Sequence, residues 1–370
     1  MRHALASPRR PPRALRIAFA GVVAACLVAG IGGGLGRAGL AAPVWLSPAV
    51  GAHAFLMICA FMGTVIGIER AVAMKRPLAF AGPLASAAAG LVMLAGAWQV
   101  AAGLAAAAAF AFVGVNLALV RRQPAAHTLL LLAAALAWAA GSGLHALGLL
   151  PGAVVPLWLC FLVFTIAAER LEMTRLMRRH AGAGPALAAI LATTACGAVG
   201  SGVVFGLALA ALAVWLAVFD IARRTFHTHG LSRYMALCLL PGYAWLAVAG
   251  LAWVATSLGQ PLQDVALHAL ALGFVFTMVL GHAPVILPAV AGVKLQFGPA
   301  FYLPLLLLHA SLALRFAGVL IGPGLTAAGA AGNALAIALF ALTLAASAIA
   351  WRVHHAPRPR SPRHDTIAEN

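Results

Sequence analysis

Five histidines lie inside long apolar stretches of this 370-residue chain: His53, His145, His268, His282 and His309. His268 and His282 share the stretch Leu267–Val290 and are fourteen residues apart. Two helical residues at that spacing face roughly the same side and lie about 21 Å apart along the axis. Because hydrocarbon solvates imidazole poorly, a histidine within a membrane span indicates a functional site. The depth of each histidine in its span therefore decides which of them can act together.

His53 and His268 lie at similar depths in the predicted second and tenth spans. These spans begin near Val44 and Leu262, so the histidines lie about 13 Å and about 9 Å below one membrane surface. Two neutral imidazoles at one depth on different helices can ligate a haem iron between them. The alternative is that each imidazole only forms a hydrogen bond to a neighbouring helix. The sequence leaves both interpretations open.

Arg315 lies near the same end of the predicted eleventh span. An arginine at the edge of the hydrocarbon costs a few kcal/mol unless it is paired or extends to the surface. A haem with its propionates toward that surface would give the guanidinium an anionic partner. We therefore treat Arg315, with His53 and His268, as a candidate cofactor-binding residue. An ion pair with Asp264 and extension to the surface are the alternatives.

His282 lies in GHAPVILP, toward the other end of the tenth span. Pro284 lacks an amide donor and we expect the span to end at Pro288, which would leave free carbonyls near the imidazole. Irregular backbone at this depth is tolerated where it lines a cavity. One hypothesis is a second metal or proton site formed by His282 and His309, with copper as a candidate ion, although two histidines are few ligands for copper. The alternative is a histidine that merely ends a helix.

Two Glu-Arg dipeptides end the second and sixth predicted spans, Glu69-Arg70 and Glu169-Arg170. Each predicts an ion pair at a helix end. The functional alternative is a proton-carrying carboxylate, because the chain has only seven acidic residues and an intramembrane glutamate is costly.

The composition places these residues in an all-α, polytopic membrane helix bundle. Mean hydropathy is +1.02 and charged residues make up 8% of the chain. A transmembrane β-barrel would instead show short strands of alternating hydropathy. We expect about 12 transmembrane helices, at residues 15–36, 45–69, 78–98, 101–120, 127–149, 153–172, 184–200, 203–222, 233–257, 262–284, 299–320 and 325–351. The turn at 200–202 is the least distinct of the breaks between them.

The basic residues predict the orientation. All but two of the 24 Lys and Arg residues fall in the two tails or in the even-numbered connections, the exceptions being Arg37 and Arg315. By the positive-inside rule both termini are cytoplasmic. The formal net charge of +17 is then a topology signal, and we expect the lipid bilayer, and no nucleic acid, as a partner.

The domain organisation follows from the short connections, which leave no room for a soluble domain. Residues 15–353 form a single transmembrane bundle domain, while the Pro- and Arg-rich tails 1–14 and 354–370 are expected to be disordered. The sequence has no P-loop, no dinucleotide-binding GxGxxG, no HExxH and no nucleophile elbow. Catalytic residues are therefore unknown, and whether the chain is an enzyme stays open.

A weak internal repeat links three of the spans. FMGTVIGIER (61–70) is similar to FLVFTIAAER (161–170), and HAFLMICAFMG (53–63) is similar to HALALGFVFTM (268–278). These segments belong to the second, sixth and tenth spans. The spacing hints at three units of four helices.

The segment HALALGFVFTM resembles the tenth-span signature of NnrS-type proteins, which are twelve-span bacterial proteins that bind haem and copper and are linked to the nitric oxide response. Gly281-His282 resembles a GH dipeptide of that family, and His53 stands where the family has a second-span HxHEM segment. The layout also resembles subunit I of haem–copper oxidases. Because the sixth and seventh spans here have no histidine, a copper triad of the oxidase kind is missing.

The resemblance implies a haem-binding, or haem- and copper-binding, multi-pass protein of the bacterial inner membrane with a redox or nitric-oxide-related stress role. A redox partner would then be expected, while the oligomeric state stays open. The alternative is a permease for a small solute or metal ion, whose path the same histidines would line. A structural or assembly role without chemistry is a third interpretation.

Overall fold

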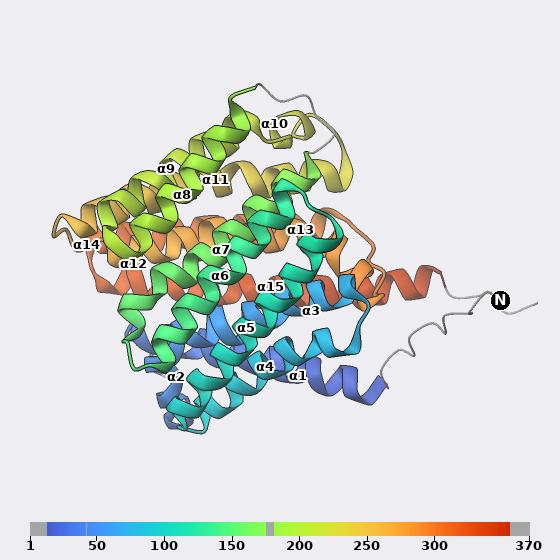
Figure 1. Cartoon of the computed structure of the whole chain (residues 1–370), viewed down its shortest axis with the longest axis horizontal. Coiled ribbons are helices and arrows are strands. Elements are labelled where there is room, and N and C mark those ends of the chain that lie inside the picture. The colour runs from blue at the N-terminus through green and yellow to red at the C-terminus, as the bar shows by residue number, and fades with distance from the viewer. Residues whose placement is uncertain (1–12, 42, 175–180, 356–370) are drawn as a thin grey trace, which may run out of the picture.

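The computed structural model describes residues 13–41, 43–174 and 181–355, which form helices joined by short connections (Figure 1). No strand occurs within these ranges. Twelve of the described helices or helical runs are long and apolar enough to cross a membrane, which confirms the predicted fold class. The predicted disorder of the two tails concerns residues that lie almost entirely outside the described ranges.

The spans are numbered here in chain order. Ten spans are single helices. In order, spans 1, 3 to 9, 11 and 12 are α1 (Arg13–Arg37), α4 (Ala81–Leu94), α5 (Trp98–Arg122), α6 (Ala126–Ala146), α7 (Pro151–Met173), α8 (Ala183–Gly200), α9 (Gly202–Phe219), α11 (Gly230–Ser257), α14 (Tyr302–Ile321) and α15 (Pro323–His354). Span 2 combines α2 (Ser47–Ala54), η2 (Phe55–Met62) and α3 (Gly63–Met74), and span 10 combines α12 (Gln263–His268), η4 (Ala269–Phe276) and α13 (Thr277–Ala291). A short helix, α10 (Ala222–Thr225), connects spans 8 and 9.

The break expected at 200–202 is present. Helix α8 ends at Gly200 and α9 begins at Gly202, with Ser201 in an extended conformation between them. The Ser201 hydroxyl accepts the N–H of Val204 at 3.4 Å, which caps the first turn of α9. Spans 7 and 8 are therefore separate helices.

The end expected for span 10 at Pro288 is wrong. Helix α13 continues through Pro284 and Pro288 to Ala291. A proline removes one backbone hydrogen bond but does not end a helix that is held by its neighbours in a membrane. The helix ends instead at Gly292, whose φ of 69° is left-handed and suits a residue without a Cβ.

Spans 2, 6 and 10, which carry the internal repeat, form the centre of the bundle. Buried residues make up 61%, 78% and 67% of their most apolar windows, against at most 50% for any other span. Helix α7 packs against both η2 and η4, and α3 packs against α13. The other spans surround these three helices, and a contact between α1 and α15 joins the first span to the last. The three helices that carry the repeat are therefore the most buried ones of the bundle.

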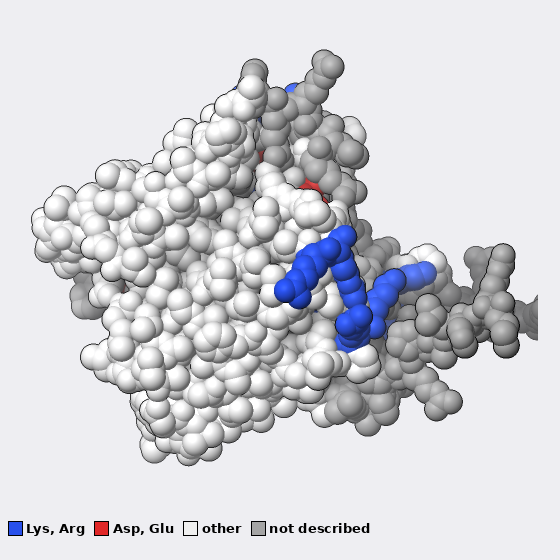
Figure 2. All heavy atoms as spheres, viewed as in Figure 1, with Lys and Arg blue, Asp and Glu red and all other residues white. Residues whose placement is uncertain are grey.

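The two ends of the bundle differ in charge. Figure 2 shows Lys and Arg side chains gathered toward one end of the visible face, while the rest of that face is almost free of charge. Helix α1 begins and α15 finishes at this end (Figure 1). We call it the basic end, and the other the opposite end.

Candidate functional site

His53 and His268 meet near the opposite end of the bundle. Their rings face each other between spans 2 and 10, with centroids 6.2 Å apart and planes inclined by 26°. The matched depth inferred from the sequence thus corresponds to a real contact. We call these two residues the histidine pair.

Hydrogen bonds fix which nitrogen of each ring is free. The Nδ1–H of His53 donates to the carbonyl of Gly30 at 2.6 Å, and the Nδ1–H of His268 donates to the carbonyl of Asp264 at 3.0 Å. A neutral imidazole that donates through Nδ1 has its lone pair on Nε2. Metal-bound histidines are usually held in this way, with the second nitrogen donating to a carbonyl or carboxylate. Both Nε2 atoms are therefore prepared to act as ligands.

The separation of the two rings also suits a shared metal. Two imidazoles on opposite sides of one metal ion, each with a metal–nitrogen bond of about 2.1 Å, have ring centroids roughly 6 Å apart. The observed 6.2 Å is close to this value. Two histidines of this kind are a donor set that a haem iron takes, and the rings, which are stacked in this structure, would have to turn for both Nε2 atoms to reach one iron.

Arg315 forms the ion pair with Asp264 that the sequence analysis held as an alternative. Its Nε and Nη2 donate to the two carboxylate oxygens at 2.8 Å and 2.6 Å. One of these oxygens, Oδ1, also lies 3.0 Å from Nδ1 of His268. Arg315 therefore holds the Asp264 carboxylate in position, and that carboxylate contacts the His268 ring. A carboxylate behind a histidine both orients the ring and raises its basicity as a ligand.

Arg37 is the second basic residue that lies away from the basic end. It is exposed at the end of α1 and acts electrostatically on His53, as Arg315 does. Among the described residues no carboxylate forms an ion pair with Arg37. An unpaired guanidinium thus lies near the histidine pair.

Each histidine of the pair is followed by a π-helical segment. Segment η2 begins two residues after His53 and η4 begins directly after His268, and each is eight residues long. The wider π-helical turn is rare and is found mostly at functional sites. Sequence reasoning missed both segments, although the similarity of residues 53–63 to residues 268–278 shows that they occupy equivalent positions.

Two glycines of α1 allow His53 to approach. A Cβ at Gly34 would lie 2.7 Å from Cε1 of His53, and Gly30 supplies the carbonyl that binds Nδ1. We expect Gly34→Val to displace the His53 ring and to cost about 1–3 kcal/mol of stability, as overpacking usually does. The control is Gly21→Val on the same helix, where an added Cβ meets nothing within 4 Å. Equal melting temperatures of the two variants in detergent would contradict this packing.

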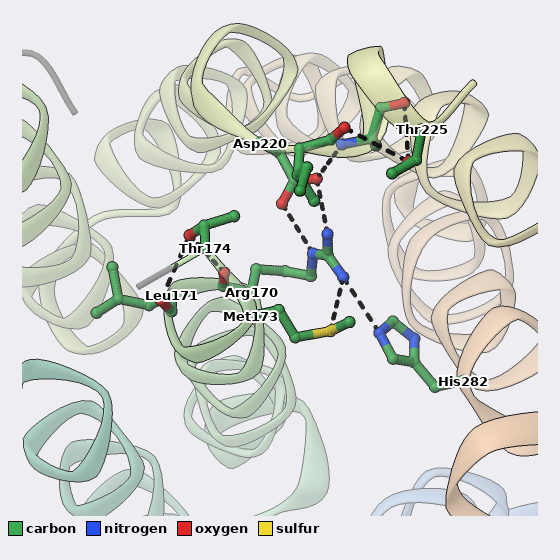
Figure 3. A network of polar contacts seen from close by, with 9 residues as sticks. Arg170, Leu171, Met173, Thr174, Asp220, Thr225 and His282 are labelled. Atoms are coloured by element: carbon green, nitrogen blue, oxygen red, sulfur yellow. Dashed lines mark hydrogen bonds and ion pairs between the residues drawn. The ribbon is translucent and has the colours of Figure 1, made fainter. Parts of the chain in front are cut away.

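A second polar cluster, the ion-pair network, lies at the basic end and is centred on Arg170 (Figure 3). The Nε and Nη2 of Arg170 each donate to a carboxylate oxygen of Asp220 at 2.8 Å. Its Nη1 lies 3.4 Å from Nε2 of His282 and 3.2 Å from the Met173 sulfur. The guanidinium therefore links span 6 to span 10 and to the connection after span 8.

The two Glu-Arg dipeptides do not form two separate pairs as expected. Arg70 contacts its neighbour Glu69 at 3.3 Å, but its shorter contact, at 2.9 Å, is with Glu169 of span 6. Arg170 pairs with Asp220 in place of Glu169. The expectation was wrong for the second dipeptide because α7 turns Glu169 toward span 2 and Arg170 toward span 8. Asp220 was missed; its signal was an acidic residue just before the basic segment Arg223-Arg224.

His282 and His309 have separate partners. His282 donates from Nδ1 to the Met278 carbonyl at 2.7 Å, while Nδ1 of His309 accepts the indole N–H of Trp245 at 2.9 Å. No hydrogen bond or ring contact joins the two histidines in the described part of the chain. Within the same ranges, no group of three or more His, Cys, Asp or Glu residues could hold a metal ion. A copper site at His282 and His309 therefore gains no support from this geometry.

The Trp245 indole gives His309 its hydrogen bond. We expect Trp245→Phe to remove that bond at a cost of about 0.5–1.5 kcal/mol, because Nδ1 of His309 would lose its donor while Nε2 is already buried without a partner. The matched control is Trp98→Phe, which changes an exposed tryptophan. A melting temperature as high as that of the control would contradict the role of this bond.

Comparison with known proteins identifies the family of this chain. No curated protein and no solved structure matches the chain. Residues 16–349 match the model of a family described as Domain of unknown function (DUF8744), which spans all twelve predicted helices. The chain therefore belongs to the DUF8744 family.

Proposed function

We propose that this integral membrane protein binds haem at the histidine pair and serves a redox or nitric-oxide-related stress role in the bacterial inner membrane. The observation that supports this most strongly is the pair itself. Two imidazoles from different helices have their Nδ1 groups anchored and their rings 6.2 Å apart. The basic end would face the cytoplasm, which places the histidine pair nearer the outer surface.

The chain offers a distinct role for each nearby side chain. His53 and His268 would supply the axial nitrogens through Nε2. Asp264 holds the tautomer of His268, and Arg315 holds Asp264. Arg37, which has no carboxylate partner among the described residues, is the group best placed to bind a propionate. This assignment moves the propionate role expected of Arg315 to Arg37.

Bis-histidine ligation favours one kind of chemistry. A bound haem would supply a reversible one-electron centre. His53 and His268 would both be engaged in holding the haem, and the chemistry that the group would then supply is one-electron transfer. We therefore infer electron transfer or redox sensing as the role of this site, in place of oxygen or nitric oxide reduction.

The visible spectrum of the protein tests this proposal. The full-length chain would be purified from haem-replete cells, and spectra would be recorded before and after addition of dithionite. We expect a Soret band that shifts on reduction. A protein without any Soret band, although haem was supplied, would refute the proposal. Uptake of a metal ion or small solute by sealed vesicles containing that haem-free protein would instead support the permease.

A further inference from the structure

Among the described residues, the ion-pair network has three carboxylates in ion pairs, those of Glu69, Glu169 and Asp220, and two arginines, Arg70 and Arg170. Arg170 is matched by Asp220, which holds it through two contacts and also accepts the Ala222 N–H at 2.7 Å. Arg70 remains as the single cation for two carboxylates, those of Glu69 and Glu169. Both contact the same nitrogen, Nη2. Within the part of the chain that the structure describes, one negative charge of this partly buried cluster therefore has no ion-pair partner of its own.

His282 does not supply the missing positive charge. A guanidinium has donors only, so the Nε2 atom of His282 that faces Arg170 at 3.4 Å is unprotonated. The Nδ1–H of the same ring is used in the bond to Met278. His282 is thus a neutral imidazole with a lone pair directed into the network.

A buried polar atom of Arg70 indicates that the network also holds water, beside its ion pairs. Arg70 is 9% exposed, and its Nε has no hydrogen-bond partner among the described residues. Tyr243 is 2% exposed, and its hydroxyl lies beside Asp220 and Arg170. Buried donors of this kind are normally satisfied by water. A polar space that water can enter is the setting in which protons move.

We propose that Glu69 and Glu169 share one exchangeable proton at the basic end of the central helices, with His282 as the next proton acceptor. The proton leaves one carboxylate ionised to neutralise Arg70, and two carboxylates close to one another do not both stay ionised in such a site. The Glu69 and Glu169 side chains are 25% and 21% exposed, which gives protons access from the basic end. Glu69 also acts electrostatically on His282 of span 10. In the described ranges, the titratable and charged groups around the pair on the helices packed against it are Arg70, Arg170, Glu172, Asp220, Tyr243 and His282.

Infrared spectroscopy of the full-length protein in lipid nanodiscs tests this inference independently of haem. The wild type at neutral pH is expected to show the carbonyl stretch of one protonated carboxyl group, which shifts in D2O. Each of Glu69→Gln and Glu169→Gln leaves a single glutamate beside Arg70. That glutamate is expected to be ionised, so each substitution should abolish the band. The control Glu172→Gln, on the same helix as Glu169, should retain it.

Each other outcome overturns the proposal. No protonated carboxyl band in the wild type at neutral pH would show that both glutamates are ionised, and this measurement needs no variant to fold. A band that persists in either glutamine variant would show a proton on one residue, or elsewhere, in place of a shared one. Loss of the band in Glu172→Gln would place the proton outside the pair. Gel filtration of each variant identifies those that fold.

Discussion

Asp220→Ala is expected to destabilise the protein by about 3–5 kcal/mol, because it leaves the buried charge of Arg170 without its carboxylate. The two side chains are 3% and 1% exposed, so water cannot replace the lost partner. The same substitution removes the acceptor of the Ala222 N–H. The measurement is the apparent melting temperature in detergent.

The control for this prediction removes both charges together. Arg170→Met with Asp220→Leu should recover most of the lost stability, since an apolar pair of similar size avoids the unpaired charge. Glu172→Ala, which removes a carboxylate that forms no ion pair among the described residues, should have little effect. A single Asp220→Ala variant that melts with the wild type would show that this ion pair is not a structural element of the basic end.

Asp264→Ala is expected to weaken haem binding by about 10- to 100-fold, as the loss of a carboxylate behind a metal-bound histidine usually does. The physical reason is that the Nδ1–H of His268 loses its carboxylate neighbour and keeps only the Asp264 backbone carbonyl, while Arg315 loses its only carboxylate partner among the described residues. Titration of haem into the haem-free protein measures the change in affinity. This prediction rests on the proposed function.

A second variant separates the orientation of His268 by Asp264 from the charge of Arg315. Arg315→Gln keeps Asp264 in place and should weaken haem binding less than Asp264→Ala does. If Asp264→Ala binds haem as tightly as the wild type, the chain from Arg315 through Asp264 to His268 has no part in holding the cofactor.

The sequence predicted the fold well because hydropathy alone determines which segments enter a membrane. It also predicted the matched depth of His53 and His268, since depth is a count of residues along a helix. These inferences depend on position along one helix and need no knowledge of its neighbours. The repeat in spans 2, 6 and 10 was visible in the sequence, but that these three helices are the central ones became clear only from the structure.

The sequence could not predict which way side chains turn. Glu169 and Arg170 are adjacent, yet the rotation of α7 sends them to different spans. The π-helical segments were hidden because Phe, Leu and Ala also suit an ordinary α-helix. The fit of His53 against Gly34 depends on the approach of two helices, which no periodicity reveals.

The most direct test of the histidine pair is the visible spectrum of His268→Gly and of His53→Gly, recorded before and after addition of free imidazole. The proposed function predicts that each variant loses the low-spin haem spectrum, and that imidazole entering the space left by the ring restores it. His127→Ala, which removes a buried histidine of span 5, should leave the spectrum unchanged. A wild-type spectrum in both glycine variants without imidazole would show that the pair does not bind haem.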